Sequence, residues 1–298
     1  MKINYHKTCT LPQDLILLLK SRGLSIPDEQ WAISYLMNIG YFRLSAYLYP
    51  LLKEPKNDHL YKDGATFDMA LNMYRFDRKL RILLFNEIEK VEVAIRSAMN
   101  NYICDGLNDV FWMSESKYFR NPIVFAKTLT LIKSEINKTK EEFIAHFRHK
   151  YSNPYPPSWM ITEIIPLGVL CNLYNNLINK NLLKKVAHQF GLPMPVFSSW
   201  ISLMANLRNL CGHHARLWNR EIPIVSHMLK NPLHPWINPA TNMRRIYFRI
   251  CIIKYLLFTV SPNNSFTQKL KSVLEKYPTI DVRAMGFPSN WQEEPLWQ

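Results

Sequence analysis

The sequence lacks an apolar run long enough to cross a membrane. A spanning helix needs roughly 18 residues with few or no charges, and Lys254 interrupts the best candidate, residues 250–260. The first residues, 1–11, carry polar and charged side chains where a secretory signal has a long apolar stretch. We therefore expect a cytoplasmic protein with no membrane partner.

Paired cysteines are also missing. The five cysteines are odd in number and scattered without paired spacing: Cys9, Cys104, Cys171, Cys211 and Cys251. This pattern is typical of reduced thiols, most of which fill a core.

The sequence offers neither an alternating strand pattern nor a Gly-rich phosphate loop, and no internal repeat or low-complexity tract. It also has no carboxylate cluster suited to magnesium. These absences disfavour a transferase that modifies RNA or nucleotides.

Acidic residues are scarce in the second half of the chain. The formal net charge is +14; residues 1–149 carry 21 Lys and Arg against 17 Asp and Glu, whereas residues 150–298 carry 16 against 6. Residues 164–274 hold thirteen basic residues and one acid, Glu221. Such a stretch lacks internal ion-pair partners, and a polyanion such as RNA would supply them. We expect Arg244, Arg245 and Arg249 to contribute to that surface.

What the sequence does contain is strong helical periodicity in a globular composition, with 48% hydrophobic and 20% charged residues among 298. In residues 67–102, apolar side chains recur at three- and four-residue steps: Met73, Phe76, Leu80, Leu84, Ile88, Val91, Ile95, Ala98 and Tyr102. This pattern predicts one helix, about 50 Å long at about 1.5 Å per residue. Glu92 and Arg96 should pair one turn apart on its outer face.

Further helices are predicted at residues 11–22 and 28–37, ended by Gly23 and Gly40, and at residues 122–149, 161–179, 182–190, 195–211 and 242–260. Residues 53–64 read as a loop, and the Pro-rich residues 153–157 are the one plausible internal boundary. We predict an all-α fold, a helical bundle built on the long helix. Its parts would be an N-terminal helical segment (1–66), a helical core (67–262) and a C-terminal extension (263–298).

The segment from Leu207 to Arg220 is the most interesting chemically. Starting at Arg208 it contains three arginines and two histidines within thirteen residues. Arginine is a permanent planar cation that suits phosphate, and histidine can both accept and donate a proton near neutral pH. On an unbroken helix Arg208 and His213 lie about 140° apart. Gly212 should let the helix end or distort, so that His213 turns toward Arg208.

This segment resembles the Arg-x4-6-His signature of the HEPN superfamily of helical ribonucleases. Its companions, in order, are Gly40-Tyr41-Phe42-Arg43-Leu44-Ser45, Tyr74-Arg75-Phe76-Asp77-Arg78-Lys79-Leu80-Arg81, Glu89-x-x-Glu92-x-x-x-Arg96-Ser97 and Leu217-Trp218-Asn219-Arg220. Together they are similar to the Abi-like abortive-infection family over residues 33–220. The resemblance implies a HEPN-like helical fold, a homodimer and a role in phage defence. It also implies a partnership with RNA, as substrate and as a regulatory non-coding RNA.

The resemblance implies Arg208, Asn209 and His213 as the catalytic residues. We place His214, Arg216 and Arg220 in the surrounding phosphate-binding shell, and Arg43, Arg75 and Arg78 as further RNA-binding candidates. Arg75 and Arg78 belong to a basic cluster that a solvated helix face would explain equally well. The aromatic residues between Tyr41 and Tyr47 could stack on bases, although core packing is the more common role for such a density.

The expected mechanism needs no metal or other cofactor. Cys211, His213 and His214 have no partners at metal-ligand spacing. The RNA's 2′-hydroxyl would attack the neighbouring phosphate and leave a 2′,3′-cyclic phosphate, with His213 moving one proton and the partner's His213 the other. The alternative is a non-catalytic RNA-binding or regulatory protein that uses the same basic surface.

Overall fold

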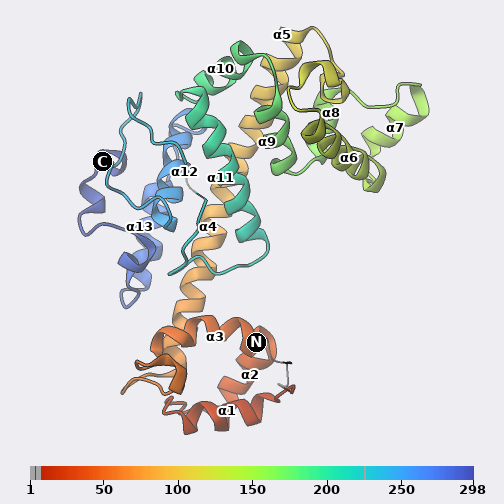
Figure 1. Cartoon of the computed structure of the whole chain (residues 1–298). Helices are drawn as coiled ribbons and strands as arrows, with labels where there is room; N and C mark the ends of the chain where they lie inside the picture. Colours follow the sequence, from red (N-terminus) through yellow and green to blue (C-terminus); the bar gives the residue numbers. More distant parts are fainter. Residues whose placement is uncertain (1–3, 5–7, 225) are drawn as a thin grey trace. The chain divides into compact units, whose positions relative to one another are not determined.

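The computed structural model of the chain describes residues 4, 8–224 and 226–298, which form helices joined by loops (Figure 1). Within these ranges there is no strand, and β-type pairing is limited to three isolated bridges. The predicted all-α class is confirmed. No helix in the described ranges has the length and apolar character needed to cross a lipid bilayer. The polar start of the chain, residues 1–11, lies partly outside the described residues.

The chain divides into two compact units. One contains residues 1–80 and 273–280, and the other contains residues 81–272 and 281–298. Helix α4 (Phe67–Met99) begins in the first unit and ends in the second, and the π-helical segment η3 (Asn100–Cys104) continues it. The predicted long helix is therefore confirmed. The domain limits 1–66, 67–262 and 263–298 stay a prediction.

The first unit consists mainly of α1 (Pro12–Ser21), α2 (Glu29–Ile39), α3 (Tyr41–Leu48) and the first part of α4. The Asp28 side chain caps α2 by accepting the backbone N–H of Trp31 at 2.9 Å. Gly40, at φ 83°, turns the chain directly from α2 into α3. Inside the unit, the Tyr47 hydroxyl donates to the buried Asp77 carboxylate at 2.6 Å.

The second unit holds the remaining helices. After the last part of α4 they are α5 (Asp105–Leu107), α6 (Pro122–Lys138), α7 (Glu142–Lys150), α8 (Ser158–Ile164), α9 (Leu167–Asn176), α10 (Lys180–Gln189), α11 (Met194–Gly212), α12 (Ile246–Val260) and most of α13 (Phe266–Lys276). Helix α11 contacts α9, α10 and α12. Helix α12 is apolar on almost every side and lies in the core of the unit.

The C-terminal residues fold back onto α12. The Trp297 indole N–H donates to the Tyr247 hydroxyl at 2.9 Å, and Leu296 and Trp291 are buried beside it. The Trp218 indole N–H donates to the Asp281 carbonyl at 3.2 Å. These contacts attach both the loop after α11 and the end of the chain to the same core.

Several predicted helix limits are wrong. Residues 122–149 form two helices, because Thr139 and Glu141 have extended backbones between α6 and α7. Residues 161–179 are also divided, because Ile165 is forced out of the helical region by Pro166. Helix α12 begins only at Ile246, after a turn in which the Asn242 side chain accepts the backbone N–H of Arg244 at 2.9 Å.

Three helices of the described residues were not foreseen, α3, α13 and the short α5. Tyr47 and Leu44 on α3 are buried, as core packing requires, whereas Phe42 is fully exposed. The aromatic segment thus divides between the core and the surface.

Candidate functional site

Arg208 lies on α11 where that helix runs along α4 (Figure 1). Its guanidinium Nε is 3.7 Å from Oε2 of Glu92, and its central carbon lies 5.7 Å from the centre of the Phe85 ring. The side chain is 41% exposed. Arg208 is thus held from one side by a carboxylate and an aromatic ring, and its other side is open to solvent.

The Glu92 carboxylate is itself fixed by Arg96. Arg96 donates to Glu92 one turn away, to the carbonyl of Thr162, and to the carbonyl of Ile165 at 2.9 Å. The predicted pair of Glu92 and Arg96 is confirmed, but its placement on the outer face is wrong. Only 12% of the Glu92 side chain is exposed, because α8 and α11 cover this part of α4.

The Glu92 carboxylate also affects the thiol of Cys171, which lies on α9. Burial and, to a lesser extent, the Glu92 carboxylate raise the pKa of its thiol to about 12. The thiol donates to the Ile201 carbonyl at 3.4 Å. Cys171 is therefore a protonated core residue and not a nucleophile.

The end of α11 is a Schellman motif with a histidine in the left-handed position. The backbone N–H of Ala215 donates to the Leu210 carbonyl at 2.9 Å, and that of His214 donates to the Cys211 carbonyl at 3.1 Å. His214 has φ 57°, the conformation that glycine usually supplies at this position. Helix α11 does end at Gly212, as expected, but Gly212 has no positive φ and the left-handed turn falls at His214, so the expected turn of His213 toward Arg208 is wrong.

His213 consequently keeps its helical register. Its backbone N–H still donates to the Asn209 carbonyl at 2.9 Å, so the helix is not distorted before His213. Arg208 and His213 therefore stay about 140° apart around the axis. Among the described residues no hydrogen bond or ion pair joins the two side chains. Asn209 and His213 are both exposed.

The loop after α11 returns along α4. Arg81 on α4 donates to the Ala215 carbonyl at 3.2 Å, and the side chains of Leu217 and Trp218 are buried. Arg220 donates to the Arg216 carbonyl at 3.4 Å, and both arginines are partly buried. The loop therefore places Arg216 and Arg220 in the same unit as Arg208, while their RNA-binding role stays a prediction.

Arg43, Arg75 and Arg78 lie in the first unit. Arg75 is engaged there: it donates to the Tyr35 hydroxyl at 2.9 Å, lies 3.6 Å from the Asp68 carboxylate and packs on the rings of Tyr35 and Trp31. Arg43 and Arg78 are exposed. The site expected from the sequence is thus divided between two units, and RNA binding by these three arginines stays a prediction.

Arg249 does not belong to any RNA-binding surface. It is fully buried, it donates to the carbonyls of Met243 at 3.1 Å and Ile224 at 2.9 Å, and burial lowers its pKa to about 10. Arg249 therefore ties the loop after α11 to α12. Arg244, in contrast, is exposed and lies 3.4 Å from Glu221.

Phe85 is a site residue that the sequence did not reveal. It lies seven positions before Glu92, two helical turns away, and a Cβ added at Gly212 would lie 3.7 Å from its ring. The step of seven was the available signal, because it places Phe85 and Glu92 on one face of α4.

No group of three His, Cys, Asp or Glu side chains able to hold a metal ion occurs among the residues that the structure describes. Metal independence stays a prediction, because it concerns the reaction.

The family model described as Abi-like protein matches residues 34–219, more than half of the chain and nearly the whole range over which the sequence motifs resemble that family. No curated protein and no solved structure matches the chain.

The Glu92 contact generates a stability prediction. Glu92→Gln removes the carboxylate that Arg96 and Arg208 share, and should lower the free energy of unfolding by roughly 3 kcal/mol, because it leaves a mostly buried arginine without its counter-charge. Denaturant unfolding measures this change. Glu89→Gln, an exposed position one turn earlier, is the matched control and should change stability by less than about 0.5 kcal/mol. Equal effects of the two substitutions would contradict the role given to Glu92.

Proposed function

Because the chain belongs to the Abi-like protein family, we propose that it is a metal-independent endoribonuclease of the HEPN type. Membership of this family implies a role in abortive infection, a defence against phage. The nuclease activity is the finer part of the proposal. It rests on the residues at the end of α11.

The proposal rests on one observation: the side chains of Arg208 and His213 have different surroundings at that helix end. Arg208 is positioned by Glu92 and Phe85 with one side open, which suits a cation that must meet a phosphate in a fixed orientation. His213 is exposed on the following turn, where an RNA substrate can reach its imidazole. Asn209, also exposed, lies between them in sequence and would orient the substrate.

The reaction that these residues support is an internal transesterification. The 2′-oxygen of a ribose forms a bond to the adjacent phosphorus, and the bond from phosphorus to the 5′-oxygen of the next nucleotide breaks. A base takes the proton from the 2′-hydroxyl, and an acid gives a proton to the leaving 5′-oxygen. Arg208 stabilises the charge that builds on the non-bridging oxygens.

A single chain is short of one proton carrier, because one histidine holds one protonation state at a time. We propose that a two-fold homodimer supplies the second His213. Three exposed apolar side chains on one side of α4, called here the apolar stripe, support this proposal. Ile82, Phe85 and Val93 are 52%, 39% and 55% exposed, the polar residues Asn86 and Glu89 lie between them, and Phe85 contacts Arg208. In the proposed dimer the stripe packs against a second copy of the chain, and the two α11 ends come close together.

A specific observation favours a second candidate function. Among the residues that the structure describes, no hydrogen bond or ion pair joins Arg208 to His213, and an isolated exposed histidine needs no catalytic role. The alternative is an RNA-binding or regulatory protein in which Arg208 holds phosphate. Both functions use the basic second half of the chain, which also supports our proposal that a bound non-coding RNA controls the protein.

Substitution of His213 separates the two functions. His213→Ala should reduce RNA cleavage by about 10²- to 10⁴-fold, because it removes the proton carrier, and should leave RNA affinity nearly unchanged. Arg208→Lys should restore activity only in part relative to Arg208→Ala, because an ammonium lacks the planar two-pronged grip of a guanidinium. The rates are measured on a labelled RNA, and affinity by filter binding. His149→Ala, at an exposed position on α7, is the control and should cleave at the wild-type rate. Full activity of purified His213→Ala protein would favour the RNA-binding alternative.

The apolar stripe generates a prediction about assembly. Ile82→Glu combined with Val93→Glu should convert a dimer to a monomer and lower cleavage in parallel, because it places charges in the proposed interface. Light scattering and the cleavage assay measure the two effects. Ile123→Glu, at a position on α6 that is 67% exposed, should leave both unchanged. A wild-type protein that cleaves at full rate as a monomer would overturn the shared-site proposal.

A further inference from the structure

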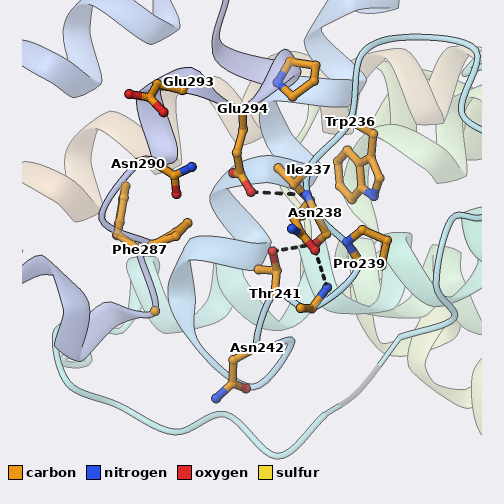
Figure 2. Close-up of a pocket in the computed structure, with 14 residues that line it drawn as sticks. Trp236, Ile237, Asn238, Pro239, Thr241, Asn242, Phe287, Asn290, Glu293 and Glu294 are labelled. Carbon is orange, nitrogen blue, oxygen red and sulfur yellow. Dashed lines mark hydrogen bonds between the residues drawn. The ribbon is translucent and has the colours of Figure 1, made fainter.

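A cavity of about 640 Å³ lies in the second unit, outside the range that matches the Abi-like family. Its walls come from the loop of residues 236–242 and from the C-terminal residues 286–295 (Figure 2). The size is in the range of pockets that hold a small organic ligand or a cofactor. The proposed ribonuclease mechanism makes no use of this cavity.

The most informative residue in the cavity wall is Glu294. Its side chain is buried, at 7% exposure for the residue. One carboxylate oxygen accepts the backbone N–H of Asn238 at 3.2 Å, and the other accepts the Tyr247 hydroxyl. In the described part of the chain no lysine or arginine forms an ion pair with it, although basic residues greatly outnumber acids in this half.

A buried carboxylate without a cation is costly unless N–H or O–H donors satisfy its oxygens. Each oxygen of Glu294 has one donor and the capacity to accept another. A ligand with two adjacent N–H donors would give each Glu294 oxygen its second hydrogen bond. The cavity should therefore favour a ligand that presents N–H donors to the Glu294 carboxylate.

The rest of the lining suits a flat ring with polar edges. Trp236 and Phe287 line the cavity with 7% and 3% of their surface exposed, because their rings also pack on Trp200 and Tyr247 in the core. Asn290 lies across the cavity from Asn238 (Figure 2). The Asn238 side-chain oxygen accepts the backbone N–H of Ala240 at 2.9 Å, which fixes that amide. Aromatic walls combined with amide and carboxylate groups are the means by which proteins recognise unpaired bases.

Two arginines follow the cavity loop in sequence, Arg244, whose guanidinium lies 3.4 Å from Glu221, and Arg245, whose guanidinium donates to Asn219 and to the Ala284 carbonyl. The Arg244 backbone is bonded to the side chain of Asn242 in the cavity lining, and the Arg245 side chain packs against Gly286 on the other wall. These arginines would repel a cationic peptide and attract an anionic nucleotide. The observations therefore favour a nucleic-acid component over a basic peptide.

We propose that this cavity binds a guanine base, whose N1–H and 2-amino group donate to Glu294. Adenine presents a ring-nitrogen acceptor beside its amino group, so its edge places a lone pair against the carboxylate. The same guanine chemistry occurs in an unpaired guanosine of RNA and in a free guanine nucleotide. The proposal does not depend on RNA cleavage, since binding at this cavity involves none of the residues at the end of α11.

Calorimetric titration of the full chain tests the proposal with two sets of probes. One set is GMP, IMP and AMP; the other is the 2′-O-methyl oligonucleotides UUGUU and UUAUU, which cannot undergo attack by a 2′-hydroxyl. Guanine should bind about 10- to 100-fold more tightly than adenine in at least one set, with IMP intermediate, because each lost hydrogen bond to a charged group costs about a factor of ten or more. Tighter binding of UUGUU than of GMP identifies RNA as the source, and binding of GMP alone identifies the free nucleotide.

Three variants locate the binding. Glu294→Gln should abolish the preference for guanine, and Ala240→Trp, at an exposed position in the lining, should block the cavity without altering the core. Glu293→Gln, the adjacent exposed carboxylate, is the matched control and should bind as the wild type does. Equal affinity for guanine and adenine, or guanine binding that survives Ala240→Trp, would overturn the proposal. The result with Ala240→Trp decides the question even if the Glu294→Gln protein fails to fold.

Discussion

The arrangement of the candidate site depends on one carboxylate, that of Glu92. It joins three segments far apart in the sequence, because Arg96 links it to the end of α8 and Arg208 links it to α11. The pair with Arg96 is mostly buried, so water screens it little, whereas Arg208 meets the same carboxylate with 41% of its side chain exposed. Without this contact α11 could still pack through its apolar face, and Arg208 would keep the Phe85 ring but lose the carboxylate that holds its charge.

The second constraint is the way in which α11 ends. A Schellman motif satisfies the last carbonyls, and the left-handed residue is His214. His213 therefore stays in helical register and exposed, on a different side of the helix from Arg208. One chain thus separates the phosphate-binding cation from the proton carrier, and this separation is a second reason, besides the need for two proton carriers, that the proposed function requires a second copy.

Apolar spacing was sufficient to predict α4 and α11, because each buries one face and the buried positions recur at helical steps. It was insufficient at residues 139–141, where no proline or glycine marks the break, and it undervalued Pro166, which restricts the residue before it. Motif resemblance located Arg208, Asn209 and His213 in sequence. It could not show that Glu92 holds Arg208 or that Arg249 is buried, because both facts depend on how distant helices pack.

The central claim is that this chain cleaves RNA by internal transesterification without a metal ion. The most direct measurement is end-group analysis of the products formed by purified wild-type protein in excess EDTA. The account predicts undiminished cleavage that leaves 2′,3′-cyclic phosphate and 5′-hydroxyl ends, since the nucleophile is the substrate's own 2′-oxygen. Cleavage that stops in EDTA, resumes with magnesium and leaves 3′-hydroxyl ends would contradict it.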